Sequence, residues 1–198
     1  MRVGVLAIQG DVPEHRHALA QSLAGGKVLE VRRPADLEGL DGLLMPGGES
    51  TTMAKLLRLT GLRDPLVGRI RDGLPVLATC AGLILLARRI APGSPGEEPE
   101  TFGALDITVR RNDYGRQVDS FEAPLRIPLL GEPPFPGVFI RSPRILEVGS
   151  GVEPIAFHGS EVVGVRSGRC WGTCFHPELG EDLRLHHAWI RSFAPSGR

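Results

Sequence analysis

Short, nearly uninterrupted apolar runs alternate with amphipathic segments over the first half of the chain. Each run ends at glycine, proline or polar residues, which is typical of strands buried on both faces of a parallel sheet. The expected strands cover residues 3–8, 28–31, 43–45 and 74–78. Apolar residues at helical spacing predict helices over 14–24, over a segment that Ser50 or Thr51 can cap, and over 83–90. This alternation implies right-handed crossovers and a mostly parallel sheet with helices on both faces.

Beyond residue 100 the pattern changes to β-type runs that glycine and proline divide. These runs cover 105–109, 137–140, 161–165 and 171–175, and a final helix is expected over about 182–193. We expect the runs to add strands to the same sheet. The segment 93–100 is interpreted as a surface loop, because neither side of it has enough length for a core of its own. The sequence therefore predicts a single domain over residues 1–198, with an α/β fold of three layers.

Composition excludes several classes of protein. Hydrophobic residues make up 41% and charged residues 23% of the chain, which is ordinary for a protein with a packed core. Lys and Arg number 23, as do Asp and Glu, so no net positive charge favours nucleic acid or an anionic membrane. The apolar stretch 74–87 is interrupted and too short to span a membrane, and no secretion signal is evident. Three cysteines, an odd count, favour a reducing compartment, so we expect a cytoplasmic protein without membrane or nucleic-acid partners.

Cys80 stands between an expected buried strand and an expected helix, in the segment Thr79-Cys80-Ala81-Gly82. This is the context of a nucleophile elbow, a sharp turn that projects a side chain into the cleft at the carboxyl end of a sheet. The helix N-terminus beside it favours the thiolate, which is the form that attacks. Taken alone, the pattern also fits a cysteine that only packs in the core.

A glycine-rich turn at residues 46–50 (Pro-Gly-Gly-Glu-Ser) follows another expected strand. Two glycines let the backbone turn and expose its N–H groups toward a ligand, as is needed to hold an oxyanion. The alternative is a tight strand-to-helix turn with no ligand. A phosphate loop is disfavoured because no Gly-Lys-Ser/Thr follows.

His176 and Glu178 flank Pro177 at the end of the last expected strand. On extended chain, residues i and i+2 point to the same side, and Pro177 disfavours helix at His176. A carboxylate beside an imidazole sets its tautomer and stabilises its cation, which is the third role in a nucleophile, base and orienter triad. A lone His in a loop is more often simply solvated, so this pair gains its meaning only together with Cys80.

Together these segments resemble the triad-type, class I glutamine amidotransferases, which hydrolyse the side-chain amide of glutamine. Seven segments spread over nearly the whole chain resemble, more specifically, the glutaminase subunit of the two-component pyridoxal 5′-phosphate synthase. They are 6–10 (LAIQG), 46–53 (PGGESTTM), 79–86 (TCAGLILL), 111–117 (RNDYGRQ), 120–122 (SFE), 138–141 (VFIR) and 175–179 (FHPEL). The resemblance implies the flavodoxin-like, three-layer fold of that class.

The resemblance also implies roles for individual residues. Cys80 would be the nucleophile, and His176 and Glu178 would complete the triad. Glutamine would contact Gly47, Gly48, Glu49, Ser50, Arg111, Ile140 and Arg141. Backbone N–H groups of Gly48 and Ala81 would hold the oxyanion, Ala81 by analogy with the residue after other elbow nucleophiles. The resemblance implies no metal and no cofactor.

A partner follows from the chemistry of the product. Ammonia released into water is mostly protonated, so a glutaminase that feeds a synthesis must deliver it by a protected route. The resemblance implies a hetero-oligomer with a barrel-shaped synthase subunit that makes the vitamin B6 coenzyme. Two alternatives stay open: a glutaminase subunit for another acceptor, such as imidazole glycerol phosphate synthase, and a redox or stress protein of the same architecture.

The remaining candidate residues receive no role in this reading. We expect Trp171 and Trp189 in the core and residues 186–187, both His, on the surface. Nothing in the sequence distinguishes His15 or His17. A metal site built from cysteines 170 and 174 with the last-strand histidine is disfavoured, because the spacing lacks a Cys-x-x-Cys pair.

Overall fold

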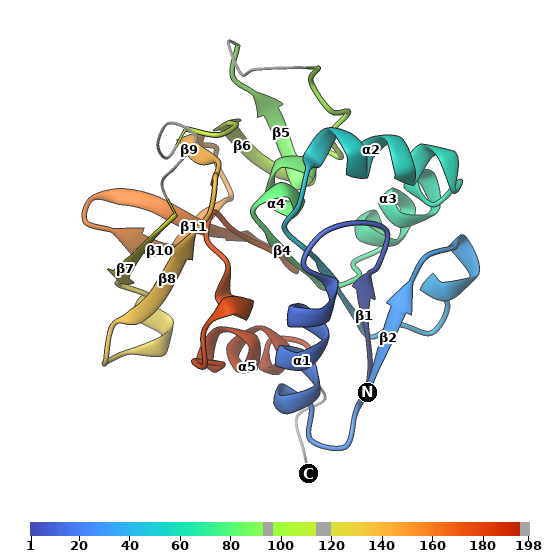
Figure 1. Ribbon diagram of the computed structural model, residues 1–198, viewed down its shortest axis with the longest axis horizontal. Coiled ribbons are helices and arrows are strands. Elements are labelled where there is room, and N and C mark those ends of the chain that lie inside the picture. The colour runs from blue at the N-terminus through green and yellow to red at the C-terminus, as the bar shows by residue number, and fades with distance from the viewer. Residues whose placement is uncertain (93–96, 114–119, 195–198) are drawn as a thin grey trace.

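A seven-stranded sheet forms the centre of the computed structural model, which describes residues 1–92, 97–113 and 120–194. The strand order is β10-β11-β12-β4-β3-β1-β2 (Figure 1). The strands are β1 (Arg2–Leu6), β2 (Lys27–Val31), β3 (Gly42–Met45), β4 (Val76–Thr79), β10 (Glu153–His158), β11 (Glu161–Ser167) and β12 (Cys170–Thr173). The five strands from β12 to β2 are parallel to one another, whereas β11 pairs antiparallel with both β12 and β10 at one edge.

The register aligns apolar side chains in a row across the parallel strands. Val5 pairs with Leu44, Leu44 with Leu77, and Leu77 with Trp171. All four side chains are at most 3% exposed. Burying an aliphatic side chain of this size stabilises a fold by about 1.5–3 kcal/mol. The strands are therefore apolar without alternation because both of their faces are covered.

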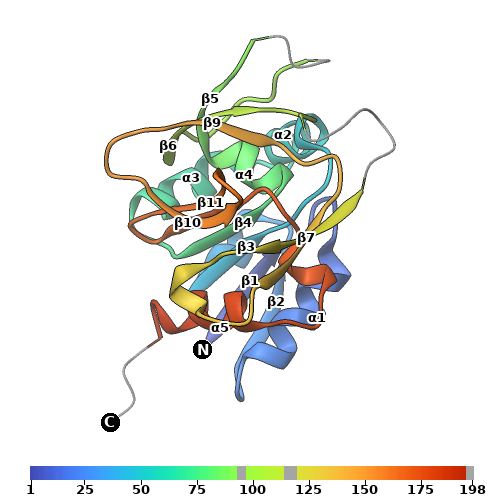
Figure 2. The same ribbon diagram turned by 90° about the vertical axis from the view of Figure 1, so that its left-hand side faces the viewer.

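Helices cover both faces of the sheet (Figures 1 and 2). On one face α1 (Val12–Ser22) contacts α5 (Arg184–Arg191), and on the other α2 (Ser50–Leu59) contacts α3 (Arg63–Arg71) and α4 (Ala81–Leu86). This arrangement confirms the α/β fold with a mostly parallel sheet and helices on both faces. The single-domain assignment of residues 1–198 stays a prediction.

Glu49, rather than Ser50 or Thr51, caps α2, so the expected cap was wrong. Its carboxylate accepts hydrogen bonds from the backbone N–H groups of Thr51 and Thr52 at 3.1 and 2.7 Å. An anionic cap satisfies two N–H groups that lack a partner in the helix and lies at the positive end of the helix dipole. Ser50 is already the first helical residue and is buried.

The helix expected over 83–90 is half helix and half strand. Helix α4 ends at Leu86, and β5 (Ala87–Ile90) continues directly from it. Strand β5 pairs parallel with β6 (Leu105–Arg110), and Arg89 on β5 bonds Asp106 and Thr108 on β6. Pairing with a partner strand overrides the local preference of this segment for helix.

Most strands after α4 do not join the central sheet, in contrast to the expectation. Strands β5, β6 and β9 (Arg144–Val148) form a three-stranded sheet, and β7 (Phe121–Leu125) and β8 (Phe135–Phe139) form a two-stranded one. Among the described residues after α4, only β10, β11 and β12 extend the central sheet. An alternating pattern specifies which face of a strand is buried but not which strand lies beside it.

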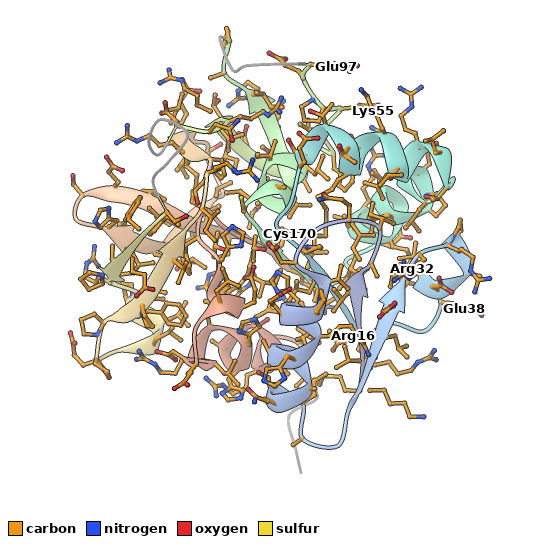
Figure 3. The ribbon with its side chains drawn as sticks, viewed as in Figure 1. Arg16, Arg32, Glu38, Lys55, Glu97 and Cys170 are labelled. Atoms are coloured by element: carbon orange, nitrogen blue, oxygen red, sulfur yellow. The ribbon has the colours of Figure 1, made fainter. Side chains whose placement is uncertain are left out.

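Most side chains of the central sheet are buried, whereas most charged side chains lie at the surface. Figure 3 shows Cys170 near the middle of the molecule, and Lys55 and Glu97 facing each other at its periphery. Cys170 is 7% exposed. Within the described residues, the structure has no helix long and apolar enough to cross a membrane. Residues 97–100 of the expected loop are neither helix nor strand, and 93–96 lie outside the described residues.

Candidate active site

Loops that follow β1, β3, β4 and β12 meet at one edge of the central sheet and line a cleft of about 150 Å³. The lining residues are Asp11, Gly48, Glu49, Ser50, Cys80, Ile84, Arg111, Asn112, Ile140, Arg141 and His176. They include every residue expected to contact glutamine except Gly47. Ligands of open α/β sheets sit at the carboxyl ends of the strands, and this cleft is at that position.

Cys80 occupies a strained turn between β4 and α4. Its φ is 47°, a left-handed value that costs energy for a residue with a side chain. Its N–H donates to Thr173 O at 2.9 Å, which ties the turn to β12. A Cβ on Gly82 would lie 2.5 Å from Met45 O, so only glycine lets α4 pack this close to β3. These features match the expected elbow, with Ala81 following the thiol as the first residue of α4.

His176 and Glu178 form a buried pair after β12. Nδ1 of His176 lies 2.7 Å from Oε1 of Glu178, and the two residues are 3% and 7% exposed. Because an ionised carboxylate can only accept, Nδ1 carries the hydrogen and Nε2 is left as the basic nitrogen. His176 is extended, as expected, but Glu178 lies in a 3₁₀ turn (Pro177–Leu179) rather than on extended chain. The turn brings the carboxylate back to the imidazole.

The neighbours of the pair stabilise its charged forms. Burial opposes ionisation of His176, but the side chains of Asp11, Cys80 and Glu178 raise its pKa well above the ordinary value. Burial likewise opposes ionisation of Glu178, but His15 and His176 lower its pKa well below the ordinary value. The structure therefore holds a buried carboxylate against the imidazole that lines the cleft with Cys80.

The glycine turn after β3 packs against the imidazole. A Cβ on Gly47 would lie 2.4 Å from Cε1 of His176, and one on Gly48 would lie 2.5 Å from Oε1 of Gln9. The backbone N–H of Glu49 donates to the same Gln9 oxygen at 2.9 Å. One backbone donor of the turn, the N–H of Glu49, is therefore already engaged by a side-chain amide.

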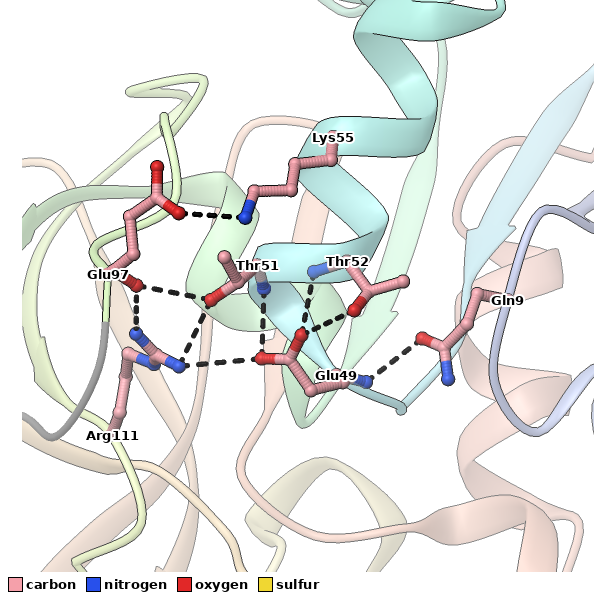
Figure 4. A network of polar contacts seen from close by, with 7 residues as sticks. All are labelled: Gln9, Glu49, Thr51, Thr52, Lys55, Glu97 and Arg111. Carbon is pink, nitrogen blue, oxygen red and sulfur yellow. Dashed lines mark hydrogen bonds and ion pairs between the residues drawn. The ribbon is translucent and has the colours of Figure 1, made fainter.

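Arg111 and Glu49 belong to one polar network rather than standing apart (Figure 4). An Arg111 Nη lies 3.5 Å from Oε1 of Glu49 and 3.3 Å from Oγ1 of Thr51, and the other Nη donates to Glu97 O at 2.7 Å. Arg111 is 7% exposed, which excludes a solvated surface arginine. Hydrogen bonds from residues 51 and 52 lower the pKa of Glu49 despite partial burial, so the network holds a carboxylate and a guanidinium at the cleft. Residues 114–117 of the motif that begins at Arg111 lie outside the described residues.

Two residues at this edge received no role from the sequence. Oδ2 of Asp11 lies 3.3 Å from Nδ1 of His176, and Nε2 of His15 lies 3.3 Å from Oε1 of Glu178. Both precede or begin α1, directly after β1. The signal was available: Asp11 and His15 are four residues apart at a helix start that follows a buried strand, which places them on one helix face at the carboxyl edge of the sheet.

Other expectations are settled by burial. Trp171 and Trp189 are 3% and 0% exposed, so their assignment to the core is confirmed. The surface assignment of His186 was wrong, because it is 0% exposed and packs in α5 toward α1. Burial lowers the pKa of His186 to about 3, so it is neutral. His187, the next residue, is only partly buried.

The sequence disfavours a metal site at Cys170, Cys174 and His176, and the structure offers no observation in its favour among the described residues. Among the described residues, the cluster with suitable spacing is Asp11, His176 and Glu178, with ligand atoms within 4.8 Å of one another. Asp11 and Glu178 both approach Nδ1 of His176, and the hydrogen bond to Glu178 already uses this nitrogen. Burial raises the pKa of Cys170 to about 11, so its thiol is protonated at neutral pH.

Comparison with known families agrees with this site. The model of the SNO glutamine amidotransferase family matches residues 5–195. The chain belongs to this family. This match confirms two expectations from the sequence: that the chain is a glutamine amidotransferase, and that it is an enzyme acting on glutamine.

Relatives match over almost their entire length. A protein of Pelotomaculum thermopropionicum named "Pyridoxal 5'-phosphate synthase subunit PdxT" is 50% identical over 198 residues, 100% of this chain and 98% of the relative. Proteins with the same name from Thermotoga neapolitana and Streptomyces avermitilis are 50% and 49% identical over 96% and 95% of this chain, and 98% and 92% of their own.

Solved structures share the fold. One described as "Crystal structure of glutamine amidotransferase" is 47% identical, has a TM-score of 0.86 and covers 96% of this chain and 97% of its own. "Structure of PurLQS from Thermotoga maritima" has a TM-score of 0.70 at 16% identity, covering 96% of this chain and 98% of its own. At that identity the likeness shows the fold alone.

Proposed function

We propose that this chain is the glutaminase subunit of a pyridoxal 5′-phosphate synthase: it hydrolyses L-glutamine to glutamate and ammonia for vitamin B6 biosynthesis. The observation that carries the proposal is that Cys80 and the His176–Glu178 pair meet at one cleft in a member of this amidotransferase family. The names of relatives that match the whole chain supply the biosynthetic context.

In the proposed mechanism, the Cys80 thiolate attacks the δ-carbonyl carbon of glutamine. Backbone N–H groups of Gly48 and Ala81 stabilise the oxyanion: Gly48 lines the cleft, and Ala81 directly follows Cys80 as the first residue of α4. His176 protonates the departing ammonia and then takes a proton from the water that hydrolyses the thioester. Glu178 keeps the hydrogen on Nδ1 of His176, so that Nε2 does the proton transfer.

The residues that line the cleft complement a glutamine molecule. Glutamine has a carboxylate, an ammonium and an uncharged amide, and the cleft offers a guanidinium, a carboxylate and backbone groups. Arg111 and Arg141 suit the substrate carboxylate, Glu49 suits its ammonium, and Ser50 and Ile140 offer further contacts on either side of the cleft. Gly47 contributes by letting the turn approach His176.

The proposed function includes a partner. The ammonia is passed to a barrel-shaped synthase subunit in a hetero-oligomer, and this chain does not make the coenzyme alone. The cellular location that follows is the cytoplasm. The chain needs no metal or cofactor of its own, because the thiol and the imidazole perform the chemistry.

An ammonia-release assay tests this proposal. The purified chain is measured alone, with the pyridoxal 5′-phosphate synthase subunit of the same genome, and with imidazole glycerol phosphate synthase as a comparison. We expect stimulation by the first partner, and a loss of at least about 10³-fold in Cys80→Ala, because removal of a triad nucleophile eliminates covalent catalysis. Cys170→Ala, a buried thiol away from the cleft, is the matched control and should retain activity.

Three results would contradict the proposal. Ammonia release by Cys80→Ala at the wild-type rate would reject the nucleophile. Stimulation by the imidazole glycerol phosphate enzyme alone would reject the partner. Thiol oxidation without glutamine turnover in any mixture would favour the redox interpretation.

A further inference from the structure

One buried imidazole connects the strand before Cys80 to the carboxylate that orients His176. His15 lies in the first turn of α1 and is 0% exposed. Its Nε2 lies 3.3 Å from Oε1 of Glu178 and 3.1 Å from Oγ1 of Thr79. Thr79 is the last residue of β4 and directly precedes Cys80. A single nitrogen therefore contacts the elements that hold both ends of the proposed triad.

The contact determines which nitrogen of His15 carries a hydrogen. Oε1 of Glu178 already accepts from Nδ1 of His176 at 2.7 Å. An ionised carboxylate oxygen can accept hydrogen bonds from two donors, but it has no hydrogen of its own to donate. The approach of His15 is therefore attractive only if its Nε2 carries a hydrogen. That hydrogen lies between the oxygens of Glu178 and Thr79, and Glu178 thereby receives two nitrogen donors on one oxygen.

We propose that His15 is a positioning residue of the glutaminase reaction: it fixes the rotation of the Glu178 carboxylate and keeps it ionised, so that Oε1 faces His176. The inference deepens the proposed function and rests on it. The role is indirect, because His15 contacts Glu178 and does not line the cleft with Cys80. The pKa of Glu178 agrees with this role, because His15 and His176 hold it below its ordinary value although burial opposes ionisation.

The charged and titratable groups around Glu178 determine how loss of His15 changes the pH dependence. His15 and Asp11 face the pair from α1, His176 adjoins it in the same loop, and His186 lies on α5 with its ring centre 6.5 Å from that of His15. His186 is neutral at catalytic pH because burial lowers its pKa to about 3. Burial raises the pKa of Glu178, and His15 and His176 lower it. Without His15 only His176 counteracts the effect of burial, so Glu178 should take up a proton at higher pH.

Three variants separate positioning from packing. His15→Leu removes the donor and retains a buried helix-forming side chain, whereas His15→Gln offers an amide N–H near the position of Nε2. His186→Leu is the matched control, since it removes another buried imidazole from the same layer, and no hydrogen bond joins that residue to Glu178 in the described part of the chain. All are measured in complex with the synthase partner, with kcat and KM for glutamine determined across pH.

We expect His15→Leu to lower kcat by about tenfold or more with little change in KM, and to move the acid limb of kcat/KM upward by about one pH unit. His15→Gln should recover most of kcat and return the limb toward its wild-type position. His186→Leu should lower the melting temperature and leave the acid limb in place. Should His15→Leu fail to fold, His15→Met, a flexible apolar replacement, takes its place.

A second readout is independent of turnover. The rate at which iodoacetamide alkylates Cys80, resolved by peptide mass, depends on the charge of His176 and hence on Glu178. We expect its pH profile to shift in His15→Leu as the kinetic limb does. If His15→Leu and His186→Leu lose kcat equally, and neither the kinetic nor the alkylation pH profile moves, His15 is only a packing residue. A wild-type complex that releases no ammonia from glutamine would instead reject the proposed function, and the alkylation profile would still decide whether His15 controls the pair.

Discussion

The hydrogen bond between His176 and Glu178 makes each residue's charge depend on the other. The folded state lowers the pKa of Glu178 below its ordinary value of 4.5, so this carboxylate contributes stability that is present above pH 4.5 and lost as pH falls through the folded value. His176 has the opposite sign: its pKa is raised above 6.5, so its contribution is present below pH 6.5 and lost as pH rises through the folded value. Between these limits both contributions act together.

Glu178→Gln tests this linkage at the level of one residue. At pH 7 the variant should unfold with a free energy lower by about 1–3 kcal/mol, because a buried charged acceptor is replaced by a neutral one. The difference from wild type should shrink as pH falls below 4.5, because the carboxylate of the unfolded chain takes up a proton there while that of the folded chain stays ionised to lower pH. Urea titrations at several pH values measure it, with Glu181→Gln, an exposed carboxyl three residues on, as the control. A difference that stays constant from pH 7 to pH 3 would show that the carboxylate's charge contributes nothing.

The start of α2 shows how one side chain serves a secondary-structure element and the cleft at once. Glu49 caps the helix through two backbone N–H groups and also contacts Arg111. Glu49→Ala should destabilise the protein by about 1 kcal/mol for the lost cap and raise KM for glutamine. Thermal unfolding and steady-state kinetics measure the two effects. Glu14→Ala, at an exposed first-turn position of α1, should change neither, and an unchanged KM in Glu49→Ala would remove Glu49 from the binding residues.

At the scale of elements, the sequence predicts what depends on local periodicity and misses what depends on partners. Strands β1, β3 and β4 are uniformly apolar, so their burial on both faces could be predicted. Helix α3 was not predicted, because Gly68 interrupts it and its apolar Leu66 and Ile70 form only a short stripe. Strand β5 was taken for helix because Leu83 to Leu86, just before it, are uniformly apolar and the pairing with β6 is not local.

The whole molecule explains why the site could be inferred only in part. Cys80 and His176 are far apart in sequence and meet because β12 pairs with β4, a neighbour relation that no local pattern encodes. The expectation that they meet rested on the rule that ligands of open α/β sheets lie at the carboxyl ends of the strands, and on the resemblance to a family. Asp11 and His15 reach the same place because β1, which lies two strands from β4 in the sheet, ends at the same edge. Residues without a motif were therefore missed although the topology brings them to the pair.

The fold also places the three thiols in different surroundings, and this gives a prediction about the whole molecule. Cys80 lines the cleft, whereas Cys170 lies at the amino end of β12 and Cys174 is fully buried beyond its carboxyl end. Burial raises the pKa values of both buried thiols, so neither is a thiolate at neutral pH. An electrophile shaped like glutamine, such as a diazoketone analogue, should therefore modify Cys80 alone. Peptide mass spectrometry measures the labelling, free glutamine should slow it, and Cys80→Ala should remain unlabelled. Labelling of all three cysteines at similar rates, unaffected by glutamine, would mean that the cleft does not select the amino acid and that Cys80 is no more reactive than the other two thiols.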